Sequence, residues 1–349
     1  MKIATLQFAP NLGDIEGNIK RANEILQHGK LLGDGPLISD GLETLKPDLL
    51  VLPELALTGY NFPSLEAIKP YVEAAGQGPC GTWARQTAQK YHCKVCVGYP
   101  EIEQTTESDA GPCYYNSLLV VDQKGEVVLN YRKTFLYYTD ETWATEGDAG
   151  RSFHSLAVKE TAAVVPTSFG ICMDINPYKF EAPFTAWEFA HRVLESKSRL
   201  VVLSMAWLTL LSREELDALA DKPDMNTFNY WVQRFWPLVK KRMDYGEEGG
   251  LEGGDEEEGG KQVVIVFANR AGEEDGHPLA RYAGTSAIIA IKQRSLPHSA
   301  SGEASSEEGE PFDVKILCWD MMGAGSEAIC FADTTDDPKM VFGLVKSSD

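Results

Sequence analysis

Short apolar runs alternate with amphipathic helical stretches along this chain, and this alternation constrains the fold more than any other feature. The stretch PDLLVLPELAL (47–57) is almost continuously apolar, as expected of a strand buried on both faces. Before it, apolar residues recur at helical spacing in EGNIKRANEILQHGK (16–30), and GTWARQTAQKYH (81–92) is again helical. The alternation predicts a layered α/β protein.

Hairpin signals interrupt the parallel pattern, so the sheets are predicted to be mixed. YYNSLLVVDQKGEVVLNYRK (114–133) contains two strand-like runs joined by a turn at 122–125. TAAVVPTSFGICMD (161–174) predicts a second strand pair, with a turn at Pro166. Further strands are expected at 262–272, 284–291, 313–320 and 328–333. No convincing linker divides the chain, and we expect a single domain over 1–349.

One later helical stretch, 228–243, contains Pro237. Proline removes a backbone donor and clashes with the preceding turn, so we expect a kink at this position.

The net charge of −20 argues against a nucleic-acid partner, which would require a basic face. Two tracts, 246–260 and 299–311, contain seven and four acidic residues and no basic ones. Gly, Ser and Glu dominate both tracts and cannot bury apolar surface, so we expect disordered acidic insertions there.

The cysteine count and the N-terminus both indicate an intracellular protein. Seven cysteines without regular spacing, in a chain of 349 residues, favour free thiols in a reducing compartment. Gln7 and Pro10 interrupt the apolar N-terminal stretch, and the longest uncharged apolar run (200–212) is too short to span a bilayer. We expect a cytoplasmic protein without a membrane partner, and leave nuclear and mitochondrial locations open.

Metal, phosphate and serine-hydrolase sites find little support. The six histidines are scattered, and neither a glycine-rich phosphate loop nor a G-x-S-x-G motif occurs. Cys93 and Cys96 form a C-x-x-C, but a strand is predicted there, in which residues three apart face opposite sides. A redox role is therefore disfavoured.

Three reactive side chains follow predicted strands directly. Glu54 comes after LLVLP, Lys133 after VVLNYR, and Cys172 after the run that ends in Ile171. A thiol becomes a useful nucleophile when a base takes its proton or a cation stabilises its thiolate. Taken singly, each residue has a structural alternative: a loop glutamate, a solvated lysine and a small buried thiol.

Taken together, the surrounding blocks resemble the nitrilase, or carbon–nitrogen hydrolase, superfamily. The blocks are IATLQFAPNLGDIEGN, LLVLPELALTGY, YYNSLLVVDQKGEVVLNYRKTFLY and FGICMDINPY, and they follow the order of the family. The resemblance implies a nitrilase-like αββα sandwich with mixed sheets and a Glu–Lys–Cys triad of Glu54, Lys133 and Cys172. It also implies a supporting glutamate, for which Glu141 is the best counterpart, and no metal or organic cofactor.

The roles that follow from the resemblance are those of a thiol amidase. Glu54 would act as general base on Cys172, then as acid toward ammonia, and finally as base for the water that hydrolyses a thioester. Lys133 would lower the thiol pKa and stabilise the oxyanion, with the backbone N–H of Met173 as a second donor.

The chain departs from common small-molecule members of the superfamily after the cysteine. Asn176 stands where an arginine is typical, and the extended CMDINPYKFEAPF resembles the fungal-type protein N-terminal amidases. This resemblance implies protein or peptide substrates with an unblocked N-terminal Asn or Gln. It further implies a link to arginyl transfer and ubiquitylation in the N-degron pathway.

Loss of the arginine suggests a task for Asp174, namely binding the substrate α-ammonium. A role in capping the turn is weighted equally. Two other functions stay open: a small-molecule amidase or nitrilase of the same superfamily, and a catalytically inactive binding module. The preference between Asn and Gln depends on one methylene and is not resolved by sequence.

Overall fold

The computed structural model describes residues 1–30, 40–104, 111–157, 163–241, 243, 261–276, 278–295 and 312–343. The predicted acidic insertions, 246–260 and 299–311, lie outside these residues. Within the described ranges, no helix is both long enough and apolar enough to cross a bilayer.

Two β-sheets face each other at the centre of the protein. The first contains, in spatial order, β14 (Ala328–Asp333), β1 (Lys2–Gln7), β2 (Leu49–Val51), β3 (Lys94–Glu103), β4 (Cys113–Val121) and β5 (Val127–Arg132). The second contains β15 (Met340–Gly343), β13 (Phe312–Met321), β12 (Ala287–Ser295), β9 (Lys261–Asn269), β8 (Leu200–Met205), β7 (Val164–Ile171) and β6 (Phe153–Ala157). Both combine parallel and antiparallel pairs, which confirms the prediction of mixed sheets.

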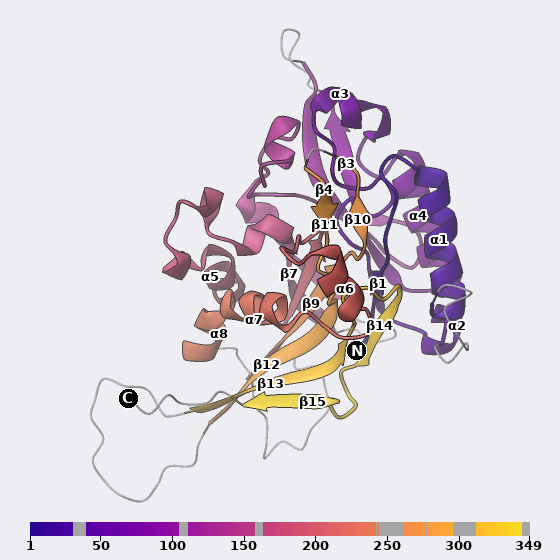
Figure 1. Ribbon diagram of the computed structural model, residues 1–349. Helices are drawn as coiled ribbons and strands as arrows, with labels where there is room; N and C mark the ends of the chain where they lie inside the picture. Colours follow the sequence, from indigo (N-terminus) through magenta and orange to yellow (C-terminus); the bar gives the residue numbers. More distant parts are fainter. Residues whose placement is uncertain are drawn as a thin grey trace, which may run out of the picture.

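Helices cover the outer face of each sheet (Figure 1). The first sheet carries α1 (Ile15–His28) and α4 (Gly78–Tyr91), and the second carries α5 (Glu188–Glu195), α7 (Met225–Gln233) and α8 (Trp236–Lys240). The shorter elements are α2 (Leu42–Leu45), α3 (Leu65–Ile68), α6 (Arg213–Ala218), β10 (Glu273–Glu274) and β11 (Ala280–Arg281). Six 3-10 turns complete them: η1 (Lys69–Tyr71), η2 (Asp140–Thr142), η3 (Ala149–Arg151), η4 (Cys172–Ile175), η5 (Tyr178–Phe180) and η6 (Phe184–Ala186). The expected αββα sandwich is confirmed.

Strand alternation explains why the strands of the first sheet are continuous apolar runs in the sequence. In β2, Leu49 and Val51 pack between the sheets, whereas Leu50 packs under α1 and α4. The two cysteines of the C-x-x-C divide in the same way. Cys96 lies between the sheets and Cys93 lies under the helices, so these thiols face opposite sides, as predicted.

One strand prediction was wrong. The described residues 163–174 do not form the predicted strand pair, because β7 continues through Pro166 and pairs with β6 instead. The carbonyl of Pro166 accepts a hydrogen bond from the N–H of Arg199 at 2.8 Å, so pairing toward β8 begins there without a proline donor. The kink expected at Pro237 is instead a full interruption of the helix just before it, since α7 ends at Gln233 and α8 begins at Trp236 with Pro237 in its first turn.

Candidate active site

Four buried side chains from the first half of the chain form a closed ring of hydrogen bonds. Lys133 Nζ donates to Glu54 Oε1 at 2.6 Å and to Asp140 Oδ2 at 2.5 Å. Asn116 Nδ2 donates to the same Glu54 oxygen at 2.7 Å and to Asp140 Oδ1 at 3.0 Å. All four side chains are inaccessible to solvent. The ring fixes the lysine and both carboxylates in single positions.

The second sheet meets this ring at the end of β8. The N–H of Glu54 donates to the carbonyl of Met205 at 3.3 Å, and Ser204 Oγ donates to the carbonyl of Leu52 at 2.9 Å. These bonds tie the end of β2 to the end of β8. The N–H of Ala206 then donates to Glu54 Oε2 at 2.8 Å, and the same N–H lowers the pKa of the Cys172 thiol. One backbone N–H therefore acts on both the carboxylate and the thiol.

Cys172 occupies a sharp turn at the end of β7. Its φ is 41°, in the left-handed region that a non-glycine residue adopts only at a cost of about 1–3 kcal/mol. The turn leads directly into η4 and leaves the thiol at the wall of a cavity. A strained strand-to-turn junction of this kind presents a nucleophile at the edge of a sheet.

The structure gives Asp174 a different place from the one a substrate ligand would need. Asp174 Oδ2 accepts hydrogen bonds from the N–H of Ile171 at 2.7 Å and from Tyr131 Oη at 2.8 Å. Asp174 Oδ1 accepts from the N–H groups of Thr134 and Phe135, at 3.0 and 2.8 Å. The carboxylate is fully buried and does not line the cavity. It clamps the Cys172 turn to the segment after Lys133, which corrects the expectation that it binds an α-ammonium.

Burial sets the protonation of the thiol. It raises the pKa of Cys172 well above the ordinary value, and the negative charge of Glu54 raises this pKa further, while Lys133 lowers it. Lys133 therefore lowers the pKa of the Cys172 thiol, as expected, but burial raises this pKa by more. The resting thiol is protonated and requires a base.

The base and the cation are tuned in opposite ways. Burial raises the pKa of Glu54, Lys133 lowers it, and the charge of Asp140 raises it again, so that the net shift is upward. A glutamate with a raised pKa is a stronger base for a thiol. Burial alone would lower the pKa of Lys133, but the carboxylates of Asp140 and Glu54 outweigh burial and raise it. Lys133 therefore stays cationic.

The second acid of the site is Asp140. The prediction of Glu141 as the supporting acid was wrong by one residue. Glu141 is exposed and has no place in the ring, whereas Asp140 begins η2 and is buried. The N–H of Tyr137 donates to Asp140 Oδ2 at 2.9 Å, which turns this carboxylate toward Lys133. Two adjacent acids in YTDET could not be separated by sequence, because the turn decides which of them points inward.

Replacing Asp140 by asparagine is expected to move the acidic limb of the kcat/KM pH profile to lower pH. Removing the charge of Asp140 lowers the pKa of Glu54, so the base stays ionised in more acidic solution. We also expect kcat to fall about 10- to 100-fold, because Lys133 loses a positioning partner. The pH dependence of ammonia release measures both effects. Glu141→Gln is the matched control, and an equal shift in both variants would contradict the assignment.

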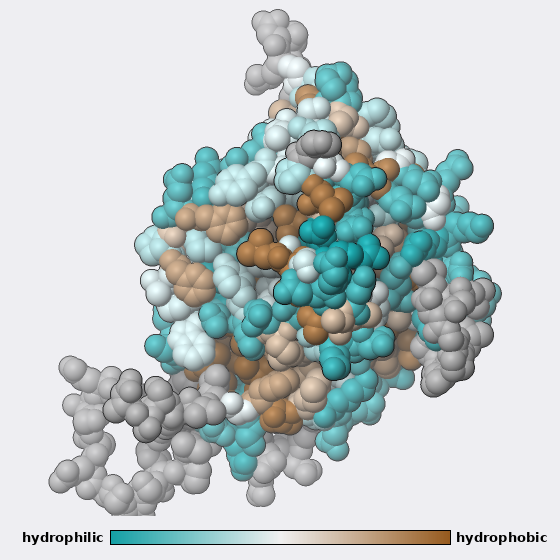
Figure 2. Space-filling view, in the orientation of Figure 1, coloured by the Kyte–Doolittle hydropathy of each residue, from teal (hydrophilic) through white to brown (hydrophobic). Residues whose placement is uncertain are grey.

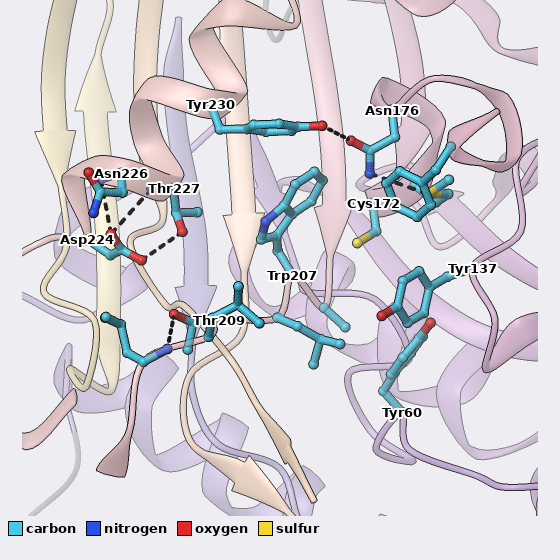
Figure 3. Close-up of a pocket in the computed structure, with 16 residues that line it drawn as sticks. Tyr60, Tyr137, Cys172, Asn176, Trp207, Thr209, Asp224, Asn226, Thr227 and Tyr230 are labelled. Atoms are coloured by element: carbon cyan, nitrogen blue, oxygen red, sulfur yellow. Dashed lines mark hydrogen bonds between the residues drawn. The ribbon is translucent and has the colours of Figure 1, made fainter. Parts of the chain in front are cut away.

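A cavity of about 470 Å³ opens beside Cys172 (Figure 3). Five aromatic residues line it: Tyr60, Tyr137, Phe180, Trp207 and Tyr230. The remaining lining residues are Cys172, Met173, Asn176, Ala206, Leu208, Thr209, Leu210, Leu211, Asp224, Asn226 and Thr227. Met173 follows the nucleophile directly, as an oxyanion donor would require. The cavity is large enough for several residues of an extended peptide.

The cavity is open to solvent, and part of its rim is apolar. Leu210 and Phe180 are among the exposed large apolar side chains. On the face that carries α6, hydrophilic side chains cover the helix and apolar patches lie beside it (Figure 2). Among the described residues, no group of three His, Cys, Asp or Glu side chains could hold a metal ion.

Besides Asp140, sequence reasoning missed two further residues of the ring and its neighbourhood. Asn116 interrupts the apolar strand β4 with a fully buried amide, and this polar residue in an otherwise apolar run was an available signal. Ala206 contributes only its backbone N–H, for which no side-chain signal exists. Asn176 does lie at the cavity, where its Oδ1 accepts a hydrogen bond from Tyr230 Oη at 2.7 Å.

Comparison with known proteins agrees with this geometry. Residues 2–176 match the sequence profile of a family described as Carbon-nitrogen hydrolase. A protein of Schizosaccharomyces pombe named Protein N-terminal amidase is 33% identical over 313 residues, which cover 85% of this chain and 94% of that protein. A protein of the same name from Saccharomyces cerevisiae is 26% identical, with 91% and 92% covered. The fold resembles a solved N-terminal amidase with an Asn-Glu-Ala peptide, with a TM-score of 0.68, 22% identity and 99% of each chain covered.

Proposed function

Because this chain belongs to the carbon–nitrogen hydrolase family, we propose that it hydrolyses the side-chain amide of an N-terminal Asn or Gln in proteins and releases ammonia. The observation that carries the proposal is the buried ion pair of Glu54 and Lys133, whose charges both act on the Cys172 thiol at the wall of a peptide-sized cavity. A relative named Protein N-terminal amidase, similar over most of both chains, supports the substrate class.

The first step is attack by the thiol. Glu54 Oε1 already accepts two hydrogen bonds from the ring, whereas, among the residues that the structure describes, Oε2 accepts a bond from the Ala206 N–H alone. Oε2 therefore takes the proton of Cys172, and the resulting thiolate attacks the carboxamide carbon. The carbonyl oxygen becomes an oxyanion. Lys133 uses two of its three N–H donors within the ring, and the third stabilises this oxyanion together with the Met173 N–H.

The second step expels ammonia, and the third restores the enzyme. Glu54 returns its proton to the amide nitrogen, the carbon–nitrogen bond breaks, and a thioester with Cys172 remains. Ammonia leaves and water enters. Glu54 then takes a proton from that water, whose oxygen attacks the thioester carbon. The carbon–sulfur bond then breaks, Glu54 passes its proton to the sulfur to restore the thiol, and the product acid loses its proton to solvent and leaves as a carboxylate.

The product is a protein with an acidic N-terminal residue. We place this reaction before arginyl transfer and ubiquitylation, since an N-terminal Asp or Glu is the substrate that arginyl transfer requires.

Mass spectrometry of short peptides tests the proposal directly. We expect peptides that begin with Asn or Gln to gain the mass difference between an amide and an acid at residue 1. The same peptides with an acetylated N-terminus, or with the Asn placed internally, should stay unchanged. Faster turnover of free Asn, 2-oxoglutaramate or simple nitriles would instead identify a small-molecule amidase or nitrilase. Inertness of the wild-type chain toward all of these amides would indicate a binding module.

A further inference from the structure

The segment that follows β8 runs along the cavity and forms one isolated antiparallel bridge, at Leu208. All six residues from 206 to 211 line the cavity. On its other side the segment pairs with residues 281–283. Thr209 N–H donates to the carbonyl of Arg281 at 2.9 Å, and Ala283 N–H donates to the carbonyl of Trp207 at 2.9 Å. These two bonds flank Leu208, which stands opposite Tyr282 in an antiparallel bridge.

This arrangement fixes the direction of the Leu208 main chain. In an antiparallel pair whose hydrogen bonds come from the flanking residues, the central residue points its own N–H and C=O away from the partner strand. Both groups of Leu208 are without a hydrogen-bond partner in the described part of the chain. Leu208 is half-buried and lines the cavity, so one donor and one acceptor face the space that a substrate enters.

The segment also begins at the catalytic carboxylate, because the Ala206 N–H bonds Glu54 Oε2. Leu208 lies two residues along the segment from Ala206. One or two methylene groups separate the carboxamide of an Asn or Gln residue from its own main chain. A substrate whose carboxamide lies at Cys172 therefore keeps its first residue beside the start of this segment, which contains Leu208.

We propose that the main chain of Leu208 binds the first residue of the substrate as a single antiparallel β-rung. The Leu208 N–H donates to the carbonyl of substrate residue 1, and the Leu208 carbonyl accepts from the substrate α-ammonium. This inference rests on the proposed function and adds to it the main-chain group that binds the α-ammonium of the substrate. A charge-assisted bond from an ammonium to a carbonyl is stronger than a neutral one, and strand addition of this kind is sequence-tolerant.

The carboxylates of the site are poor alternatives for the ammonium. Asp174 is buried with both oxygens occupied. Asp224 is the one carboxylate among the described lining residues, and it lies at the opposite end of the cavity from Cys172, beyond Trp207 (Figure 3). Its oxygens already accept from the N–H groups of Asn226 and Thr227 and from Thr227 Oγ1.

The test compares Leu208→Pro with Leu208→Ala on two peptides. Both variants lose the leucine side chain, but only proline loses the N–H. One peptide begins with Asn, and the other carries a trans alkene in place of its first peptide bond and so lacks the carbonyl of residue 1. On the Asn peptide we expect kcat/KM of L208P to be about tenfold below that of L208A, mainly through KM. On the alkene peptide the two variants should be equal.

Equal kcat/KM of L208P and L208A on the Asn peptide would contradict the proposed pairing. An equal loss of kcat/KM in L208P on both peptides would contradict it as well. Should L208P fail to fold, the wild type decides the question with alkenes at the first or second peptide bond. Replacement of the first bond must then cost several-fold more than replacement of the second, and equal costs overturn the proposal. A wild type inert on the unmodified Asn peptide rejects the proposed function and this inference together. A wild type active on that peptide, with no coupling to Leu208, rejects the inference alone.

Discussion

Replacement of Cys172 by alanine or serine is expected to reduce ammonia release by at least about 10⁴-fold, because the acyl-enzyme can no longer form. The serine variant should also be inactive. Burial already raises the pKa of the thiol, and an alcohol in the same place is far harder to deprotonate. We expect the free energy of unfolding to change by only about 1 kcal/mol, because the side chain is small and lies at a cavity wall. Ammonia assays and thermal melts measure the two quantities.

Cys113→Ser provides the control for this experiment. Cys113 is a half-buried thiol on β4 and does not line the cavity. Its replacement should leave ammonia release intact. More than a tenth of the wild-type rate in C172S, or a loss in C113S equal to that in C172S, would contradict the assignment of the nucleophile.

Replacement of Lys133 by methionine is expected to remove activity and destabilise the fold. The ammonium is fully buried between Glu54 and Asp140, so the variant keeps two buried carboxylates without their cation. Breaking a buried ion pair in this way costs about 3–5 kcal/mol. Loss of the oxyanion donor should lower kcat by about 10²–10³-fold or more. Urea unfolding and ammonia release give the two measurements.

The stability loss in K133M should depend on pH in a defined direction. Without Lys133, burial and the charge of Asp140 raise the pKa of Glu54 further above its value in the unfolded chain. The folded state then binds more protons than the unfolded state, so stability falls as pH rises through the raised pKa of Glu54. The variant should be least destabilised in acid. Adding Glu54→Gln and Asp140→Asn should recover stability but not activity, whereas stability unaffected by K133M at neutral pH would contradict the buried ion pair.

The sequence predicted features that depend on neighbouring residues better than features that depend on contacts between distant residues. Glu54, Lys133 and Cys172 could be singled out because each directly follows a recognisable strand within a family block. Asp140 could not be distinguished from Glu141, because the choice depends on a one-residue rotation within η2 and on the Tyr137 N–H that orients the inner carboxylate. Pro166 was mistaken for a turn residue, because proline rarely lies inside a strand and only β6 and β8 reveal its surroundings.

The order of residues by itself determined the layered architecture and the kinds of side chain available for chemistry, since hydrophobic period and local motifs act over a few residues. The three-dimensional fold decided the rest: that Asp174 clamps the nucleophile turn, that Asn116 completes the ring, and that Leu208 pairs with Tyr282. These outcomes depend on which backbone donors and acceptors remain after distant strands pair. The sequence does not show which of these groups stay unpaired, because nearly every residue carries the same backbone N–H and C=O. Only long-range strand pairing decides which of them remain free.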